Sequence, residues 1–140
     1  MITKRKRKLP LIMIADPDEE ERGLMRAILK LVGFDVIEAT NSHQAVKLVR
    51  ECSPDLLVID LSLSRLPGND GVERIRREAA RPKLPIVAVS TTQTNPLPHG
   101  SKSSTAFLLK PVEYEQFYLL VDRFLPGRMT ALARSRVLPL

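Results

Sequence analysis

The chain has 140 residues, of which 44% are apolar and 27% charged, a size and composition that suit one globular domain with its own core. No apolar stretch approaches the roughly 20 residues that cross a bilayer. The single cysteine, Cys52, excludes an intrachain disulfide and a CxxC metal or redox pair. We therefore expect a cytoplasmic protein without a membrane span.

The net charge of +6 is unevenly distributed along the chain. Residues 4–8 are five consecutive Lys or Arg, whereas residues 9–127 hold 14 basic and 16 acidic side chains. A run of like charges is typical of a disordered, solvated arm. We predict a basic arm at 1–8, a mildly acidic domain at 9–127, and a tail or helix extension at 128–140.

Short apolar runs recur along the domain and are separated by segments of helical period. The runs predict strands at Leu11–Ala15, Asp35–Ala39, Leu56–Ile59, Ile86–Val89 and Ala106–Leu109. Apolar runs bounded by turn signals are typical of buried strands. Strands that alternate with helices predict a doubly wound α/β fold, with a parallel sheet between two helical layers.

Helices are predicted at 19–32, from 41 or 42 to 52, from 70 to 79, and at 112–124. Asn41 or Ser42 is expected to cap the second helix and Asp70 the third, and Gly33 stops the first. The inward face of the first helix is expected to be Leu24, Ile28, Leu31 and Val32.

One interval departs from this alternation. Residues 91–105 contain Pro96, Pro98 and Gly100, which disfavour a regular helix. We therefore expect the helix between the fourth and fifth strands to be short or missing, with His99 as an ordinary loop residue.

The predicted strand ends bring together chemically distinct side chains. Asp16 closes the first strand, Asp60 the third and Ser90 the fourth, and Lys110 follows the fifth. The carboxyl ends of parallel strands meet at one edge of an open sheet. A carboxylate nucleophile, a second acid, a hydroxyl and an ammonium there predict a site that accepts a phosphoryl group with the help of a divalent cation.

These motifs, in this order, resemble the receiver domain of two-component response regulators, over about residues 9–127. The resemblance is carried by Pro54-Asp55 before Asp60, by Asp60-Leu61 leading into Pro67-Gly68-Asn69-Asp70-Gly71, by Val89-Ser90, and by Lys110-Pro111. It implies a flavodoxin-like, five-stranded fold with strand order 2-1-3-4-5.

The resemblance also implies roles for single residues. Asp60 would be the phosphoacceptor, Lys110 the phosphate-binding lysine, Ser90 the switch hydroxyl and Phe107 the switch aromatic. Pro111 would follow Lys110 through a cis peptide bond.

The implied cofactor is Mg²⁺, held by Asp16, Asp60 and the backbone carbonyl of Ser62. Receivers usually end the first strand with two adjacent acids, and here Pro17 stands in the second position. Asp18 or Glu19 could reach the ion, but a shifted carboxylate suits octahedral coordination poorly. We therefore expect weak Mg²⁺ binding.

Plainer roles are open for each of these residues. Asp60 and Lys110 could be a charge pair left in an inert site, and Ser90 a common turn residue. Asp16 could simply cap the first helix, because it precedes a proline. These alternatives correspond to a pseudo-receiver, the same fold used as a protein-interaction module without a phosphorylation cycle.

The favoured interpretation is a single-domain response regulator, phosphorylated on Asp60 by a histidine kinase or phosphotransfer protein. It would be no enzyme beyond its own phosphotransfer and dephosphorylation. The residues after Lys110 are too few for an output domain, so a partner protein is expected to carry the output, with homodimerisation left open. Nucleic acid is a disfavoured partner, because the domain is acidic and no aromatic residue interleaves the basic run.

Overall fold

The computed structural model describes residues 8–63, 68–91 and 104–131, without the side chains of residues 68 and 69. Its elements in chain order are β1 (Leu11–Ala15), α1 (Glu19–Leu31), β2 (Asp35–Ala39), α2 (Ser42–Cys52), β3 (Leu56–Asp60), the 3₁₀ turn η2 (Leu61–Leu63), α3 (Gly68–Glu78), β4 (Ile86–Ser90), β5 (Thr105–Leu109) and α4 (Tyr114–Phe124).

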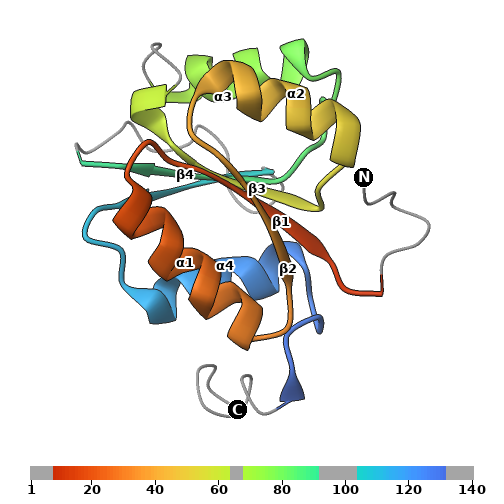
Figure 1. The fold of residues 1–140 in the computed structure, drawn as a ribbon, viewed down its shortest axis with the longest axis vertical. Coiled ribbons are helices and arrows are strands. Elements are labelled where there is room, and N and C mark those ends of the chain that lie inside the picture. Colours follow the sequence, from red (N-terminus) through yellow and green to blue (C-terminus); the bar gives the residue numbers. More distant parts are fainter. Residues whose placement is uncertain (1–7, 64–67, 92–103, 132–140) are drawn as a thin grey trace.

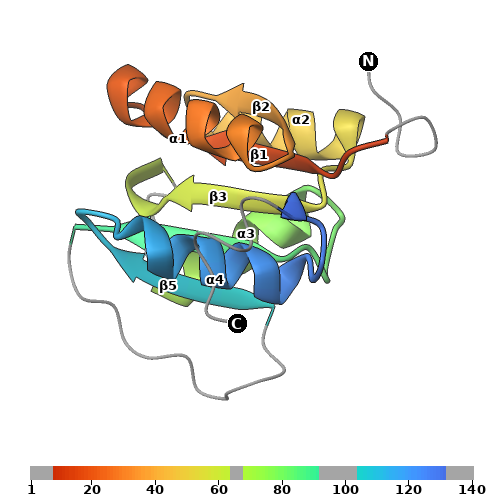
Figure 2. The ribbon, with the colours of Figure 1, turned by 90° about the horizontal axis from the view of Figure 1, so that it is seen from below.

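The strands form one parallel sheet of five strands in the order β2-β1-β3-β4-β5. Helices α1 and α4 cover one face and α2 and α3 the other (Figures 1 and 2). The predicted flavodoxin-like topology is therefore confirmed. The predicted loss of a helix between β4 and β5 concerns residues 92–103, which lie outside the described residues.

The sheet separates two apolar clusters. Met25, Leu29, Phe34, Phe117 and Val121 belong to the cluster on the α1 and α4 side. The other cluster lies under α2 and α3. Every residue of β1 is buried, as expected for a strand covered on both faces. Within the described ranges, no helix has the length and apolarity needed to cross a membrane.

The predicted inward face of α1 is confirmed at Val32, which is 4% exposed, and wrong at Leu24 and Leu31. Leu24 is 52% exposed and Leu31 is 81% exposed, whereas Met25 and Leu29 are buried. Both sets repeat at helical spacing, so periodicity could not choose between them. The rotation of α1 is set by tertiary contacts, because Arg22 and Arg26 both pair with Glu38 on β2.

The predicted helix starts are partly confirmed. Asn41 caps α2 by accepting a hydrogen bond from the Gln44 N–H at 2.8 Å. Asp18, not Asp16, caps α1. Asp70 is not a cap, because the chain is already helical from Gly68.

The segment after α4 returns to the body of the domain. Met129 is 4% exposed and joins the cluster of α1 and α4. The Thr130 N–H donates to the Val32 carbonyl at 3.0 Å. Gly33 makes this approach feasible, because its φ is +108° and a Cβ there would lie 2.9 Å from Thr130 Cγ2.

The burial of α1 gives a direct test of its orientation. Leu29→Ala should lower the free energy of unfolding by about 2–5 kcal/mol, because it leaves a cavity in the core. Leu31→Ala, the matched control on the exposed face, should change it by less than about 0.5 kcal/mol. Urea denaturation followed by circular dichroism measures both, and equal losses would contradict the orientation.

Candidate functional site

The parallel register places the predicted site residues at one edge of the sheet. Ala15 pairs with Ile59, Asp60 with Val89, and Ser90 with Leu109. The strands therefore end nearly level. The Lys110 N–H donates to the Ser90 carbonyl at 2.8 Å, which sets the start of the β5–α4 connection beside the end of β4.

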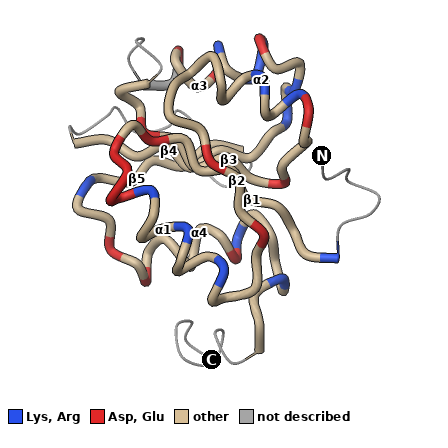
Figure 3. The backbone as a smooth tube through the Cα atoms, viewed as in Figure 1, with Lys and Arg blue, Asp and Glu red and all other residues tan. Residues whose placement is uncertain are grey.

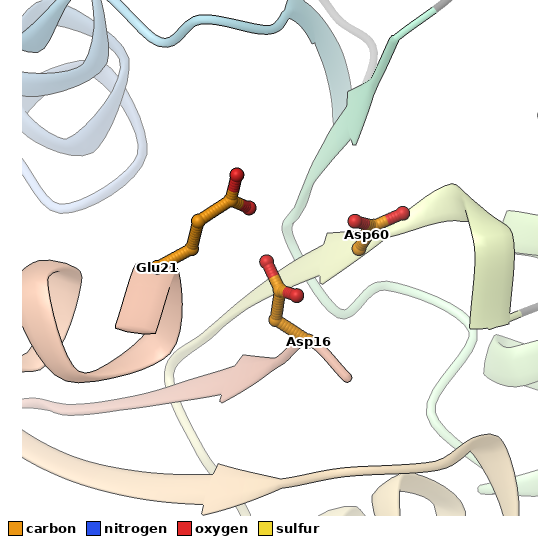
Figure 4. A group of neighbouring side chains, drawn as sticks. All are labelled: Asp16, Glu21 and Asp60. Atoms are coloured by element: carbon orange, nitrogen blue, oxygen red, sulfur yellow. The ribbon is translucent and has the colours of Figure 1, made fainter. Parts of the chain in front are cut away.

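Three carboxylates surround the ammonium of Lys110. Its Nζ lies 2.6 Å from Asp60 Oδ2, 2.5 Å from Glu21 Oε2 and 3.6 Å from Asp16 Oδ2. Figure 3 shows acidic positions at the start of α1 beside this edge of the sheet, and in Figure 4 the three carboxylates point toward a common space. With every group ionised, these four side chains sum to a charge of −2.

Glu21 is the site residue that the sequence analysis missed. It lies in a run of four acids, Asp18 to Glu21, in which no member is marked by composition. Its position four residues before Met25, which the structure shows to be buried, places it on the sheet-facing side of α1. The sequence carried no signal for this, because helical period did not distinguish the face with Met25 from the face with Leu24. Asp18, which was predicted as a weak metal ligand, accepts from the Glu20 and Glu21 N–H groups through its Oδ1.

Asp16 is held by the chain around it. Its Oδ1 accepts from the Asp18 N–H at 2.8 Å. Its carbonyl accepts from Arg22 Nη1 at 2.8 Å, and Arg22 also bonds Glu38 on β2 at 3.0 Å. The alternative role of Asp16 as the cap of α1 is therefore wrong, although its carboxylate orders the turn that leads into the cap.

Asp60 and its neighbours are ordered in the same local way. Its Oδ1 accepts from the Ser62 N–H at 2.8 Å, so η2 folds back over the end of β3. The Lys110–Pro111 peptide bond is cis. The other motif residue, Asp55, is structural: its Oδ2 accepts from the Leu11 N–H at 2.9 Å, which joins the starts of β3 and β1.

The pKa values of Asp16 and Asp60 are shifted in opposite directions. Burial raises the pKa of Asp16, and its hydrogen bond from Asp18 and the charge of Lys110 only partly offset this. Burial acts on Asp60 too, but hydrogen bonds from Lys110 and Ser62 hold the pKa of Asp60 below its usual value. Burial alone would lower the pKa of Lys110, but its bonds to Asp60 and Glu21 raise it well above normal. Asp60 is thus kept ionised and hydrogen-bonded.

A cavity of about 320 Å³ opens beside these groups. Its polar rim is formed by Asp16, Glu21, Asp60 and Lys110. Its apolar wall is Ile14, Ala15, Leu24, Met25, Val58, Val89, Pro111, Val112 and Tyr114. A small anionic group entering it would meet the Lys110 ammonium and the Asp60 carboxylate together.

The donor set suits a hard divalent cation. Asp16, Glu21 and Asp60 each offer a carboxylate oxygen, and these oxygens all lie within 4.8 Å of one another. Magnesium prefers such oxygen ligands, and the site's negative charge favours a cation. The resemblance also assigns the carbonyl of Ser62 to the ion. Ser62 lies in η2, two residues after Asp60, which ends β3.

Of the remaining predicted residues, Ser90 lies at this edge and Phe107 lies in the middle of β5. Ser90 ends β4 and is half-buried. Phe107 lies in β5, half-buried against the cluster under α2 and α3.

Known proteins are similar to this chain in sequence and in fold. The response regulator receiver domain family matches residues 12–122. PilH of Pseudomonas aeruginosa is 25% identical over 118 residues, which cover 83% of this chain and 98% of PilH. The sensor histidine kinase CheAY of Helicobacter pylori is 23% identical over 81% of this chain, and the regulator RpaA of Synechocystis 27% identical over 84%. The chain spans only 15% of CheAY and 49% of RpaA.

Solved structures agree on the fold. A receiver protein from Sinorhizobium medicae has a TM-score of 0.68 at 24% identity and covers 86% of this chain and 98% of its own. CheY4 of Vibrio cholerae has a TM-score of 0.67 at 18% identity, with coverages of 83% and 98%.

An α/β sheet with acids and a lysine at its carboxyl edge defines a receiver-type signalling domain. Together with the family match over most of its length, this shows that the chain belongs to the response regulator receiver family of two-component systems.

The pKa values of Asp60 and Asp16 are shifted in opposite directions. Removing the charge of each residue should therefore change the free energy of unfolding in opposite directions. Asp60→Asn should lower the free energy of unfolding at neutral pH by about 1.5–3 kcal/mol, the range for hydrogen bonds to charged groups. Asp16→Asn should raise it, because a buried carboxylate with a raised pKa destabilises the folded state when ionised.

The pH dependence of the free energy of unfolding is the control for these two variants. The stabilisation from Asp60 is present above its unfolded pKa near 3.8 and is lost as the pH falls through the lowered folded pKa. The cost of Asp16 is complete above its raised folded pKa and absent below 3.8. Urea denaturation at several pH values should show that the difference in free energy of unfolding between each variant and the wild type becomes smaller toward acid pH. If both variants changed the free energy of unfolding in the same direction at neutral pH, the assignment would be contradicted.

Proposed function

We propose that this receiver accepts a phosphoryl group on Asp60 from a phosphohistidine of a histidine kinase or phosphotransfer protein. The observation that carries the proposal is the Lys110 ammonium 2.6 Å from the Asp60 carboxylate, at the rim of a cavity that can admit a phosphoryl group. An acid that is ionised, oriented and reachable is what a nucleophile of this kind requires.

In the transfer, a carboxylate oxygen of Asp60 attacks phosphorus and forms an acyl phosphate. The phosphorus–nitrogen bond to the donor imidazole breaks, and the imidazole keeps the electron pair. Lys110 neutralises negative charge on the arriving oxygens. Magnesium, when bound by the acids of the site, would supply further positive charge to those oxygens.

The signal would leave the site through β4 and β5. In this proposal the Ser90 hydroxyl moves to the new phosphoryl oxygens, and Phe107 turns into the space that Ser90 vacates. Phe107 is half-buried against the α2 and α3 cluster, so its movement would reshape the surface near the ends of β4 and β5. That surface is the proposed contact for an output partner protein.

The relatives support a kinase as the phosphodonor. Sequences similar to this chain occur within proteins named as sensor kinases, CheAY of Helicobacter pylori and LuxN of Vibrio harveyi. In this proposal, the protein catalyses no reaction other than phosphorylation and dephosphorylation of its own Asp60.

A pseudo-receiver is the second candidate function. Pro17 favours it, because proline supplies no carboxylate in the position where receivers place an acid. In this alternative the Lys110–Asp60 pair is only structural, and the domain binds its partner without a phosphate cycle.

Labelling distinguishes the two functions. Acetyl phosphate with Mg²⁺, or a cognate kinase, should add a phosphoryl group to Asp60, which borohydride reduction and mass spectrometry would locate. Asp60→Asn should abolish the label. Label that survives in this variant would refute the assignment, and no label from any donor would favour the pseudo-receiver.

The basic arm is proposed to be dispensable for phosphorylation. Deleting residues 1–8 should leave the fold and the labelling of Asp60 unchanged, because the deletion keeps β1 and the Pro10 carbonyl, which accepts from the Asp35 N–H. Filter binding with DNA at two salt concentrations tests the arm itself. Tight, salt-sensitive binding that the deletion removes would overturn the proposal of a protein partner.

A further inference from the structure

We propose that Glu21 is a ligand of Mg²⁺ in this receiver and supplies, from the first turn of α1, the carboxylate that Pro17 lacks. The inference deepens the proposed function, since the ion would serve phosphoryl transfer, but it is measurable without any phosphodonor. The inference is specific to this chain, because it concerns which residue supplies the carboxylate that Pro17 lacks.

The start of α1 explains why Glu21 is available. Asp18 is the N-cap and Glu21 is the third residue of the helix. In a capping box, the acid at that position bonds back to the N–H of the cap residue. Here Asp16 Oδ1 already accepts the Asp18 N–H, so Glu21 is released from capping and its carboxylate turns to Lys110 instead.

Helix geometry explains why Glu21 rather than its neighbours reaches the site. Glu21, Met25 and Leu29 repeat every four residues, and the last two are buried against the sheet. Glu21 therefore stands at the top of the buried stripe, above the sheet edge. Glu19 and Glu20 precede Glu21 by two residues and one residue, so they lie on other sides of the helix than this four-residue repeat. Among the side chains that the structure describes, the group able to hold a metal is Asp16, Glu21 and Asp60.

The charges at the site leave room for a divalent ion. Lys110 neutralises one of the three carboxylates, so a net charge of −2 remains. The bonds from Asp18 and Ser62 occupy one oxygen of each aspartate, and a carboxylate oxygen has lone pairs for more than one partner. Glu21 is half exposed, at 48%, so its side chain has the freedom to share its oxygens between Lys110 and an ion.

The test is calorimetric titration of the full chain with Mg²⁺ alone. Glu21→Gln should weaken binding at least about tenfold, the effect of one unit charge about 4 Å from a divalent ion in a high-dielectric site. Glu20→Gln removes the same charge from the same helical turn and should change affinity by less than about twofold. Circular dichroism melting confirms that both variants are folded.

Two further variants distinguish direct coordination of Mg²⁺ by Glu21 from a general electrostatic effect of its charge. Glu21→Asp keeps the charge but shortens the side chain by one methylene, and should also weaken binding. Adding Pro17→Asp to Glu21→Gln should restore affinity, and by a larger factor than Pro17→Asp changes the wild type. The proposal is overturned if Glu21→Gln binds within twofold of Glu20→Gln, or if the wild type shows no Mg²⁺ binding at millimolar concentration. Asp60 labelling is scored separately, so either proposal can fail alone.

Discussion

The contact between the Lys110 ammonium and three carboxylates is the interaction on which the rest of the site depends. Lys110 is the only cation at the common edge of β1, β3 and α1 among the described residues that line the cavity. Without it, the acids at these positions would repel one another in a partly desolvated space. The sheet brings the acids together, and the lysine makes that arrangement tolerable.

The excess negative charge costs stability and serves function. Asp16 is buried with a raised pKa, so folding disfavours its ionised form. Such strain is common where a site is built to bind rather than to be stable. Asp60, by contrast, is stabilised as an anion by Lys110 and Ser62, which suits an acid that must attack as a carboxylate.

Helix α1 connects the packing of the domain to the chemistry of its edge. Its buried stripe anchors it on the sheet, while Arg22 and Arg26 bind Glu38 on β2. The same rotation that buries Met25 and Leu29 brings Glu21 over the strand ends. A change in the orientation of α1 would therefore alter the core and the charge of the site together.

Much of the fold was determined by the sequence itself. Apolar runs separated by helical segments are local patterns, and they located the five strands to within a residue at each end. The common position of Asp16, Asp60, Ser90 and Lys110, at or directly after a strand end, followed from the rule that parallel strands end at one edge. The helix starts and the face of α1 were less certain, because adjacent residues offered equivalent caps and equivalent periodicity.

Tertiary structure decided which acid of the run from Asp18 to Glu21 belongs to the site. All four carry the same charge, and the local sequence gives Asp18 and Glu21 an ordinary capping pattern. The choice depends on Asp16, which takes the Asp18 N–H, and on Lys110, 89 residues away from Glu21 in the chain. A contact between residues so far apart depends on how β5 and α1 pack on the sheet, which no local pattern specifies.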